Sequence, residues 1–327
     1  MSEPLLQVQD LEVHYRVRRG AWGRRVPLRA VAGVDFAMRA HEALGVVGES
    51  GCGKSTLARA ILALVPRSAG RILWSGRDVA ALAGAERQRL RREVQIIFQN
   101  PLASLDPRMP VEALIGEPLT VHRPDLDARA RERAVRGLLA QLGLAQDLAW
   151  RYPHELSGGQ CQRVAIARAM ILHPKLLVCD EAVSALDVSM QAQIIELLGA
   201  LKAEHGLALL FISHNLAVVR ELCERVLVLY LGRMMELAPA QLLYAHPLHP
   251  YTRALFAAIP IPDPQVQPAR LAQTLPGEPP SALAPPHGCV FHARCPHVIA
   301  RCRSEIPAWE ALSDGRHVAC HRWREIG

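Results

Sequence analysis

Two glycine-rich segments, about a hundred residues apart, are the parts of this sequence best suited to bind phosphate. Consecutive glycines let backbone N–H groups turn toward phosphate oxygens, and a helix that begins there directs its positive end at the same point. In the first segment, Lys54 would neutralise the β- and γ-phosphates of a nucleotide and the Ser55 hydroxyl would bind Mg²⁺. The predicted nucleotide-binding residues are Gly48, Glu49, Ser50, Gly51, Cys52, Gly53, Lys54, Ser55 and Thr56.

The second segment, Leu156-Ser157-Gly158-Gly159-Gln160, resembles a helix start without its own lysine. An N-cap followed by flexible glycines is the simplest interpretation. The functional alternative is a second anion cradle. Because one subunit already has its cradle, the second would act on a phosphate bound by a different subunit. The residues predicted to do so are Ser157, Gly158, Gly159 and Gln160.

Two carboxylates follow an apolar strand, Leu176–Cys179. Asp180 at the strand end can hold Mg²⁺ directly or through water, and Glu181 can polarise an attacking water. Without the glycine loop, such a pair would more often be explained as the negative charge at a helix N-terminus. Together with the loop, it predicts a hydrolytic site.

Two further polar residues follow strands in the same way. His214 comes after the strand 208–212 and could contact the γ-phosphate and orient Glu181 and the water. Gln99 follows the strand 94–98 and could reach Mg²⁺ and the water. Open α/β sheets bind ligands at the carboxyl ends of their strands, which is where both residues would lie.

Strands alternate with helices along the main part of the chain, which predicts an α/β fold with a mostly parallel sheet. Residues 5–15 and 27–48 have strand character, and helices are expected at 54–65 and 157–172. The region 112–150 is predicted to be helical, with Pro118 and Pro124 as breaks. Residues 246–290 are rich in proline, which predicts a short helical segment followed by an extended connector. Buried strands are expected at 43–47, 94–98, 176–179, 208–212 and 226–230.

Length and composition restrict the class of protein. The 327 residues suffice for one large domain and a smaller appendage, and half of them are hydrophobic. No apolar run reaches the length of a membrane helix, and the first residues do not resemble a secretory signal. We therefore expect a cytosolic protein, or one attached to a membrane through partners.

The formal charge of +7 and the pI of about 9.2 permit contact with nucleic acid or an anionic membrane. The basic residues are spread along the chain, and the densest stretch is Arg16–Arg25. This stretch is interpreted as a solvated hairpin, with lipid headgroup contact as the alternative. Only three lysines occur, at 54, 175 and 202, and one lies in the glycine loop, where a slim point charge suits a phosphate cradle.

Four of the eight cysteines lie in the last 39 residues, separated by five, six and seventeen residues. Zinc sites usually have tighter cysteine pairs, and four thiolates at this spacing fit a [4Fe–4S] cluster as well as zinc. From the residues alone, iron–sulfur, zinc and no metal all stay open. His292, His297, His317 and His321 would be substitute ligands for zinc. The candidate cluster ligands are Cys289, Cys295, Cys302 and Cys320.

The ordered set of motifs resembles the ATP-binding subunit of an ABC transporter over residues 5 to about 240. The resemblance implies a P-loop core with a mostly parallel sheet, an antiparallel β subdomain, a helical subdomain at about 100–170 and a cysteine-rich extension at 241–327. It further implies that ATP is sandwiched between the Lys54 loop of one subunit and the Ser157 loop of another, with Glu181 as catalytic base. Asp187 would belong to the loop that couples the two sites, and Tyr15 would stack on adenine.

Four other segments resemble the dipeptide/oligopeptide importers: Asn100–Met109, His249–Leu255, Gly277–Pro280 and Gly288–Phe291. Within these importers, Gly51–Leu57 and Phe211–His214 resemble the second, F-type ATPase subunit. Two residues depart from the usual pattern: Cys161 replaces an arginine and Asn215 an aspartate. Neither removes a phosphate ligand, so we expect ATPase activity to survive. The tails of such importers carry iron–sulfur clusters, and this favours [4Fe–4S] over zinc for the four cysteines.

The resemblance implies ATP and Mg²⁺ as ligands. The implied partners are a second, related ATPase subunit in a heterodimer, two transmembrane permeases and, indirectly, an external peptide-binding protein. Nucleic acid is not expected as a partner. The implied location is peripheral, at the cytoplasmic face of a bacterial inner membrane. Alternatives are an importer ATPase for nickel or a sugar, a soluble ABC ATPase acting on nucleic acid or ribosomes, and a nucleic-acid-binding protein with a zinc-finger tail.

Overall fold

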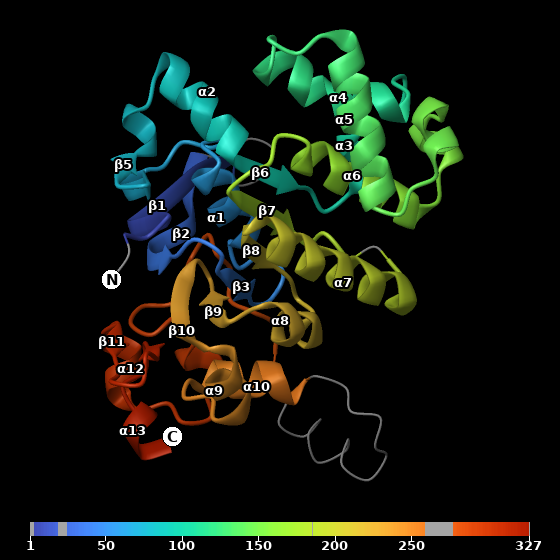
Figure 1. Ribbon diagram of the computed structural model, residues 1–327. Coiled ribbons are helices and arrows are strands. Elements are labelled where there is room, and N and C mark those ends of the chain that lie inside the picture. The colour runs from blue at the N-terminus through green and yellow to red at the C-terminus, as the bar shows by residue number, and fades with distance from the viewer. Residues whose placement is uncertain (1–2, 19–24, 185, 259–276, 327) are drawn as a thin grey trace.

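An eight-stranded sheet forms the centre of the computed structural model, which describes residues 3–18, 25–184, 186–258 and 277–326 (Figure 1). The five strands from β9 to β6 run parallel, and β10, β12 and β11 are added antiparallel at one edge. The predicted α/β fold with a mostly parallel sheet is therefore confirmed. The spatial order is β11 (Glu310–Ala311), β12 (His317–Val318), β10 (Arg233–Pro239), β9 (Arg225–Tyr230), β3 (Ala43–Val47), β8 (Ala208–Ile212), β7 (Leu176–Asp180) and β6 (Val94–Ile97).

The central strands are apolar up to Asp180 at the end of β7, because both faces of the sheet are covered. Every residue of β3, β7 and β8 is buried. Alternate residues belong to different apolar clusters: Leu44 and Val46 pack with the helix α1 and the second sheet, whereas Ala43 and Val47 pack with the other helices. The strand ends are thereby fixed, and they carry the polar residues of the site.

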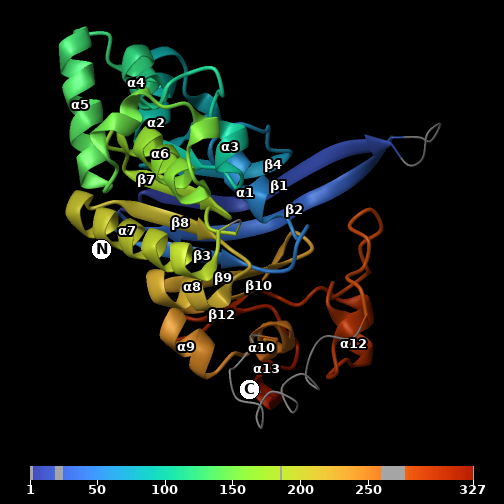
Figure 2. The same cartoon turned by 90° about the vertical axis from the view of Figure 1, so that its right-hand side faces the viewer.

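A second, antiparallel sheet packs beside the first one and matches the antiparallel β subdomain implied by the resemblance. Its order is β2 (Arg25–Met38), β1 (Leu6–Arg18), β4 (Ala69–Trp74) and β5 (Arg77–Asp78). The hairpin of β1 and β2 extends away from the body of the molecule (Figure 2). Of the basic stretch Arg16–Arg25, the described residues lie at the end of this hairpin, where Arg18 pairs with Arg25, and residues 19–24 lie outside the described residues.

Helices cover both faces of the sheet, and a group of them forms a separate lobe beyond β6 and β7 (Figure 1). The lobe contains α3 (Pro101–Ser104), α4 (Val111–His122), α5 (Ala128–Gln141), α6 (Gly158–Met170) and the 3₁₀ turns Gln146–Trp150 and Pro153–Glu155. The other helices of the core are α1 (Lys54–Ile61), α2 (Gly84–Glu93), α7 (Val188–His205) and α8 (Leu216–Leu222), with a further 3₁₀ turn at Val79–Ala81.

Two helix predictions need correction. The first helix ends at Ile61 instead of 65, because Ala63 has a φ of 54° and Pro66 disfavours a helical conformation at the residue before it. Pro118 lies inside α4 and does not end it. The buried residues Leu114 and Leu119 on either side of this proline hold the helix against its neighbours, so tertiary packing overrides the local preference.

The C-terminal residues pack along β9 and β10, at the bottom of Figure 1. β12 pairs directly with β10, so this part of the chain continues the main sheet. The predicted short helical segment is present as α10, whereas much of the predicted connector, residues 259–276, lies outside the described residues. The division of the chain near residue 240 stays a prediction. The elements are α9 (Ala240–Ala245), α10 (Pro250–Ala257), the 3₁₀ turn His292–Arg294, α12 (Ala300–Ser304), β11, β12 and α13 (Trp323–Ile326).

Candidate nucleotide-binding site

The first glycine segment forms a tight loop between β3 and α1, as predicted from the strand-loop-helix pattern. Gly53 is the N-cap of α1 and has a φ of 107°, which L side chains rarely adopt. A Cβ atom at this position would lie 2.1 Å from the carbonyl oxygen of Ala30 in β2. Glycine is therefore required here both for the backbone conformation and for the close approach of the hairpin.

The Lys54 side chain folds back into this loop and is almost fully buried, with 4% exposed. Its Nζ donates to the carbonyl oxygens of Gly48 at 2.8 Å and Glu49 at 3.0 Å. The ammonium is thus held inside the loop at the N-terminus of α1, where a bound phosphate would gain from both positive charges.

Ser55 and Asp180, which are 125 residues apart, meet at the ends of α1 and β7. The Ser55 hydroxyl donates to Asp180 Oδ1 at 2.8 Å. Asp180 is 3% exposed, and burial raises the pKa of its carboxyl while the Ser55 hydrogen bond opposes that shift. A hydroxyl and a carboxylate in contact supply the oxygen ligands that Mg²⁺ prefers.

Glu181 lies next to them and is surrounded by three of the predicted site residues. Gln99 Nε2 donates to Glu181 Oε2 at 2.7 Å, and His214 Nδ1 lies 3.7 Å from the same oxygen. Lys54 Nζ lies 3.9 Å from Oε1. The sequence-based expectation that these side chains converge at the ends of β3, β6, β7 and β8 therefore agrees with their positions in the fold.

The backbone of Glu181 has a φ of 52°, a left-handed conformation that is strained for a residue with a side chain. Its N–H donates to the Ile212 carbonyl at the end of β8, and its own carbonyl accepts from the Ser184 hydroxyl at 2.9 Å. These bonds hold the strained residue, and they turn its carboxylate toward Gln99 and His214.

The second glycine segment caps α6 and is exposed at Ser157 and Gly158. The Ser157 hydroxyl accepts from the Gln160 N–H, and the Gln160 side chain accepts from the Ser157 N–H, which is a capping box. A Cβ atom on Gly159 would lie 1.7 Å from Met190 Cε of α7. Within the described residues, no hydrogen bond joins this segment to residues 48–56.

Three other predicted residues have the following surroundings. Asp187 is exposed and caps α7 by accepting the Met190 N–H at 2.9 Å, and Ala185 two residues earlier lies outside the described residues. Tyr15 lies on β1 opposite Leu28 and is half-buried against the apolar cluster of the second sheet. Cys161 is fully buried, and its thiol donates to the Pro153 carbonyl. Its side chain points into the helical lobe and does not line a surface.

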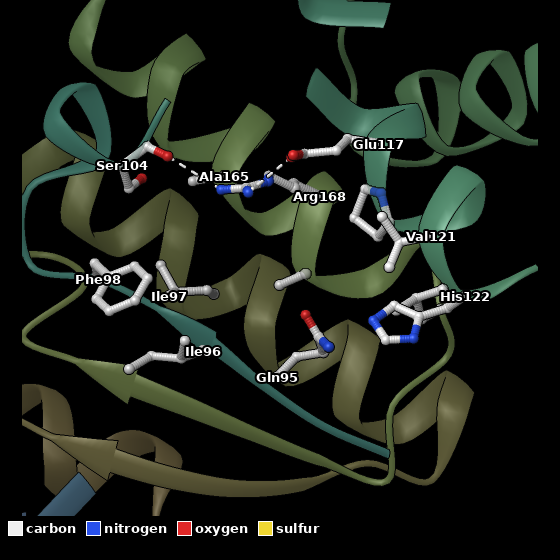
Figure 3. A pocket seen from close by; sticks show the side chains of 13 residues that line it. Gln95, Ile96, Ile97, Phe98, Ser104, Glu117, Val121, His122, Ala165 and Arg168 are labelled. Carbon is white, nitrogen blue, oxygen red and sulfur yellow. Dashed lines mark hydrogen bonds and ion pairs between the residues drawn. The ribbon is translucent and has the colours of Figure 1, made fainter. Parts of the chain in front are cut away.

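A groove of about 270 Å³ lies between β6 and the helical lobe, and Figure 3 shows its lining. Arg168 crosses it, with Nη2 donating to Glu117 at 2.9 Å and Nη1 to the Ser104 carbonyl at 3.0 Å. Val121 at its rim is 63% exposed, which is unusual for an apolar side chain of this size. The strand that forms its floor continues directly into Gln99, which contacts the Glu181 carboxylate, so the groove and this carboxylate are one short loop apart.

The four C-terminal cysteines gather in one region but do not form a metal site in the structure. All four thiols are free, and the Cys289 N–H donates to the Cys302 carbonyl at 2.9 Å. Burial raises the pKa of Cys289 to about 12 and of Cys320 to about 11, with smaller contributions from the neighbouring thiols. Among the described residues, no group of three histidines, cysteines or carboxylates is arranged to hold a metal ion.

Three of the histidines considered as substitute ligands contact other groups. His292 Nδ1 lies 2.9 Å from the Cys289 carbonyl, His317 stacks on Trp309, and His321 Nε2 lies 3.1 Å from the Glu305 carbonyl. For His297, the backbone carbonyl accepts from Arg322. No histidine of the described residues belongs to a group that could hold a metal ion, so the structure does not support the zinc alternative with histidine ligands.

Two residues outside the predicted set contact the phosphate loop. The Tyr251 hydroxyl accepts from the Glu49 N–H at 2.9 Å, and Arg294 Nη1 donates to the Glu49 carboxylate. In the sequence, Tyr251 belongs to a segment that resembles the peptide importers and was not predicted to be a site residue. Arg294 was not predicted either. Nothing in the local pattern around Arg294 distinguishes it from the other arginines.

The arrangement of a glycine loop, a buried lysine and carboxylates at adjacent strand ends defines a P-loop ATPase of the ABC type. Residues 31–184 match the ABC transporter family and residues 235–302 match the family "Oligopeptide/dipeptide transporter, C-terminal region". Together with the relatives described next, these matches show that the chain belongs to the ATP-binding subunits of ABC transporters. Proteins of this family hydrolyse ATP, and the hydrolysis is coupled to transport.

Three relatives align with almost the whole chain. The probable peptide ABC transporter ATP-binding protein y4tS of Sinorhizobium fredii is 50% identical over 98% of this chain and 90% of its own length. The oligopeptide transport protein OppF of Salmonella typhimurium is 49% identical over 94% and 92% of the two chains. The di/tripeptide transport protein DppF of Pseudomonas aeruginosa is 48% identical over 98% of each.

Solved structures of ATP-binding cassettes share the fold. A dimeric post-hydrolysis state of the cassette MJ0796, bound to ADP and Pi, superimposes with a TM-score of 0.64 and 26% identity. The match covers 72% of this chain and 98% of that one. The cbiO1 subunit of the Clostridium perfringens cbiONQ transporter gives the same TM-score at 25% identity, over 75% of this chain and 92% of its own.

Proposed function

We propose that this chain binds and hydrolyses ATP to power the import of di- and oligopeptides through an ABC transporter. The contact of Ser55 with Asp180, beside Glu181 and the buried Lys54, is the observation that carries the ATPase part. The peptide part is supported by relatives that are named for transport of peptides, oligopeptides and di- or tripeptides. Importers of nickel or a sugar are the alternative substrate classes.

Each site residue has a proposed role. Residues Gly48–Thr56 would surround the phosphates of ATP, with the Lys54 ammonium leaving its carbonyl partners for the β- and γ-phosphates. Ser55, Asp180 and Gln99 would hold Mg²⁺, which supplies charge neutralisation at the phosphate oxygens when bound. The Ser55–Asp180 contact fits this role because it presents oxygen ligands at the edge of the phosphate loop.

Glu181 is the proposed general base, and it would accept a proton from the attacking water. Gln99 and His214 already contact or approach its carboxylate, so they are placed to orient Glu181 and, for His214, to meet the γ-phosphate. Tyr15 is proposed to stack on adenine, and its half-buried ring on β1 is compatible with that role.

The Ser157 segment is proposed to bind the ATP held by a second subunit. It is exposed and caps a helix, and it makes no hydrogen bond to the phosphate loop of its own chain within the described residues. The cassette MJ0796, which shares the fold, was solved as a dimer. Two anionic nucleotides between opposed cradles would close the dimer, and hydrolysis would remove that attraction. Asp187, which caps α7, would belong to the loop that couples the two sites.

The partners are proposed to be a related but different ATPase subunit and two permeases, with an external peptide-binding protein acting through them. The groove in Figure 3 is the proposed permease site, because its exposed Val121 and its Arg168–Glu117 pair lie one loop away from Gln99. Among the described helices, none has the length and apolar character of a membrane span. The proposed location is peripheral, on the cytoplasmic face of a bacterial inner membrane, and relatives that are ATP-binding proteins of peptide transport support it.

Uptake of labelled peptides by cells tests which substrate the transporter carries. A strain that lacks this chain is expected to lose uptake of labelled di- and tripeptides and to regain it when the wild-type gene is supplied. The other subunits should co-purify with the tagged full chain from membranes. Loss of nickel or sugar uptake, with peptide uptake intact, would contradict the peptide assignment while leaving the ATPase assignment in place.

We further propose that Cys289, Cys295, Cys302 and Cys320 hold a [4Fe–4S] cluster as thiolates. Four thiols in one region support this, although the side chains would have to rearrange from their positions in the structure. Chain purified without oxygen should be brown and contain about four iron atoms and about as much sulfide. Stoichiometric zinc in colourless protein, or no metal at all, would overturn the cluster assignment.

A further inference from the structure

The C-terminal part of the chain touches the phosphate loop at Glu49, the residue after its first glycine. Two contacts from distant segments meet there. The Tyr251 hydroxyl of α10 accepts from the Glu49 N–H at 2.9 Å. Arg294 Nη1 donates to both carboxylate oxygens of Glu49, at 2.8 and 3.0 Å. We call Glu49, Tyr251 and Arg294 the Glu49 clamp.

Each member of the clamp is held in place by its own surroundings. Tyr251 is fully buried and packs against Tyr230 and Phe291, with ring centroids 4.7 and 5.4 Å away. Arg294 is 8% exposed, and its guanidinium lies 6.0 Å from the Tyr230 ring centroid and 3.4 Å from the Tyr230 hydroxyl. Because these side chains are packed on several sides, they cannot follow Glu49 if the loop moves.

The segment that carries Tyr251 is anchored in turn by a buried carboxylate. Glu236 of β10 is fully buried, and its two oxygens accept from the N–H groups of Leu248 and His249, each at 2.9 Å. His249 Nδ1 then accepts from the Tyr251 N–H at 3.0 Å. The start of α10 is thus fixed to the main sheet, and the Tyr251 hydroxyl has a defined position behind the loop.

The clamp holds a residue that also makes one of the two lysine contacts that the nucleotide must change. The Glu49 N–H donates to Tyr251, and the Glu49 carbonyl accepts from Lys54 Nζ at 3.0 Å. When Lys54 turns to phosphate, that carbonyl loses one donor and keeps the Cys52 N–H at 3.3 Å, while the clamp still holds the N–H and the carboxylate of Glu49. A loop whose shape is fixed before binding loses less conformational entropy when ATP arrives.

We propose that Tyr251 and Arg294 are positioning residues, which act through Glu49 to hold the phosphate loop in the shape that binds ATP. This inference rests on the proposed nucleotide site and assigns part of its affinity to the C-terminal part of the chain. The clamp touches neither Glu181 nor Gln99, so its loss should weaken binding of ATP and its transition state equally.

The test compares matched variants of the full chain for ATP binding and, in the assembled transporter, for kcat and KM. Arg294→Ala is expected to raise the Kd and KM for ATP about tenfold, the order expected for one buried charge-assisted hydrogen bond, with kcat changed less than about twofold. Tyr251→Phe removes only the hydroxyl and should raise the Kd and the KM for ATP about threefold to tenfold. Arg294→Lys, which keeps a donor to the carboxylate, should recover most of the affinity.

Two variants control for a purely structural effect. Tyr244→Phe removes another buried hydroxyl of the same region, which donates to the Leu216 carbonyl and does not contact the loop. Arg301→Ala removes an exposed arginine that pairs with Glu305. Both should bind ATP as the wild type does. The double variant Glu49→Gln/Arg294→Ala should bind ATP about as well as Arg294→Ala, because both changes break the same contact.

Wild-type ATP affinity in folded Arg294→Ala and Tyr251→Phe would overturn the inference, as would an equal loss of affinity in Tyr244→Phe. Lys54→Ala serves as the reference for the site itself. If Lys54→Ala abolishes ATP binding and the clamp variants do not affect it, the clamp inference fails and the nucleotide site stands. If Lys54→Ala also binds normally, the proposed site is wrong.

Discussion

Glu181→Gln should reduce ATP hydrolysis by about two to four orders of magnitude, the contribution of a positioned general base, while ATP still binds. Glutamine keeps the size of the side chain and an oxygen that can accept from Gln99, but it cannot take a proton from water at neutral pH. Phosphate release by the assembled transporter measures the rate, and binding of labelled ATP measures the affinity. In the proposed mechanism, hydrolysis of ATP opens the dimer. Without hydrolysis, ATP should therefore stay trapped between the two subunits.

Glu196→Gln is a matched control, since Glu196 is an exposed glutamate on α7 away from the site. It should hydrolyse ATP at the wild-type rate. Hydrolysis at full rate by Glu181→Gln would show that Glu181 is not the base. His214 would then be the next candidate, because its ring lies 3.7 Å from the Glu181 carboxylate and would face the same water.

Lys54→Ala should weaken ATP binding by about 100-fold or more, the effect of removing one partner of a buried charge pair. The ammonium is 4% exposed and lies within the phosphate loop, so no solvent ion can replace it easily. Binding of a fluorescent ATP analogue to the full chain measures the loss. Cells that carry this variant should also take up less peptide, because the transporter binds ATP more weakly.

Lys175, one of the two other lysines of the chain, provides the comparison. Lys175 is half-exposed and pairs with Glu93 at 3.0 Å, and exposed pairs of this kind contribute at most about 1 kcal/mol. Lys175→Ala should therefore bind ATP normally. An equal loss of affinity in Lys175→Ala would mean that lost charge or lost stability, and not the phosphate loop, explains the Lys54 result.

The central residues of the site were predictable because strand ends in a parallel sheet meet at one edge. Lys54, Asp180 and His214 each follow a short buried strand, and this pattern can be recognised without a structure. The parallel register then brings their side chains together, although up to 160 residues separate them in sequence. Local pattern and sheet topology lead to the same positions here.

The rest of the site depends on tertiary packing, which no local pattern encodes. Arg294 reaches Glu49 across 245 residues, and it contacts Tyr230, which packs on Phe291. Cys161 was noted as a departure next to the second glycine segment, yet its thiol is buried toward Pro153. The cysteine spacing indicated a metal cluster, but spacing does not determine how the thiols are oriented.

The Glu49 clamp also has a consequence for the order in which the protein is made. The phosphate loop leaves the ribosome early, whereas Arg294 follows 245 residues later. The loop therefore cannot reach its final set of contacts until nearly the whole chain has been synthesised. A chain that stops short of Arg294 retains every phosphate-binding residue but lacks the pair that fixes the loop, so incomplete subunits would compete poorly for ATP in the cell.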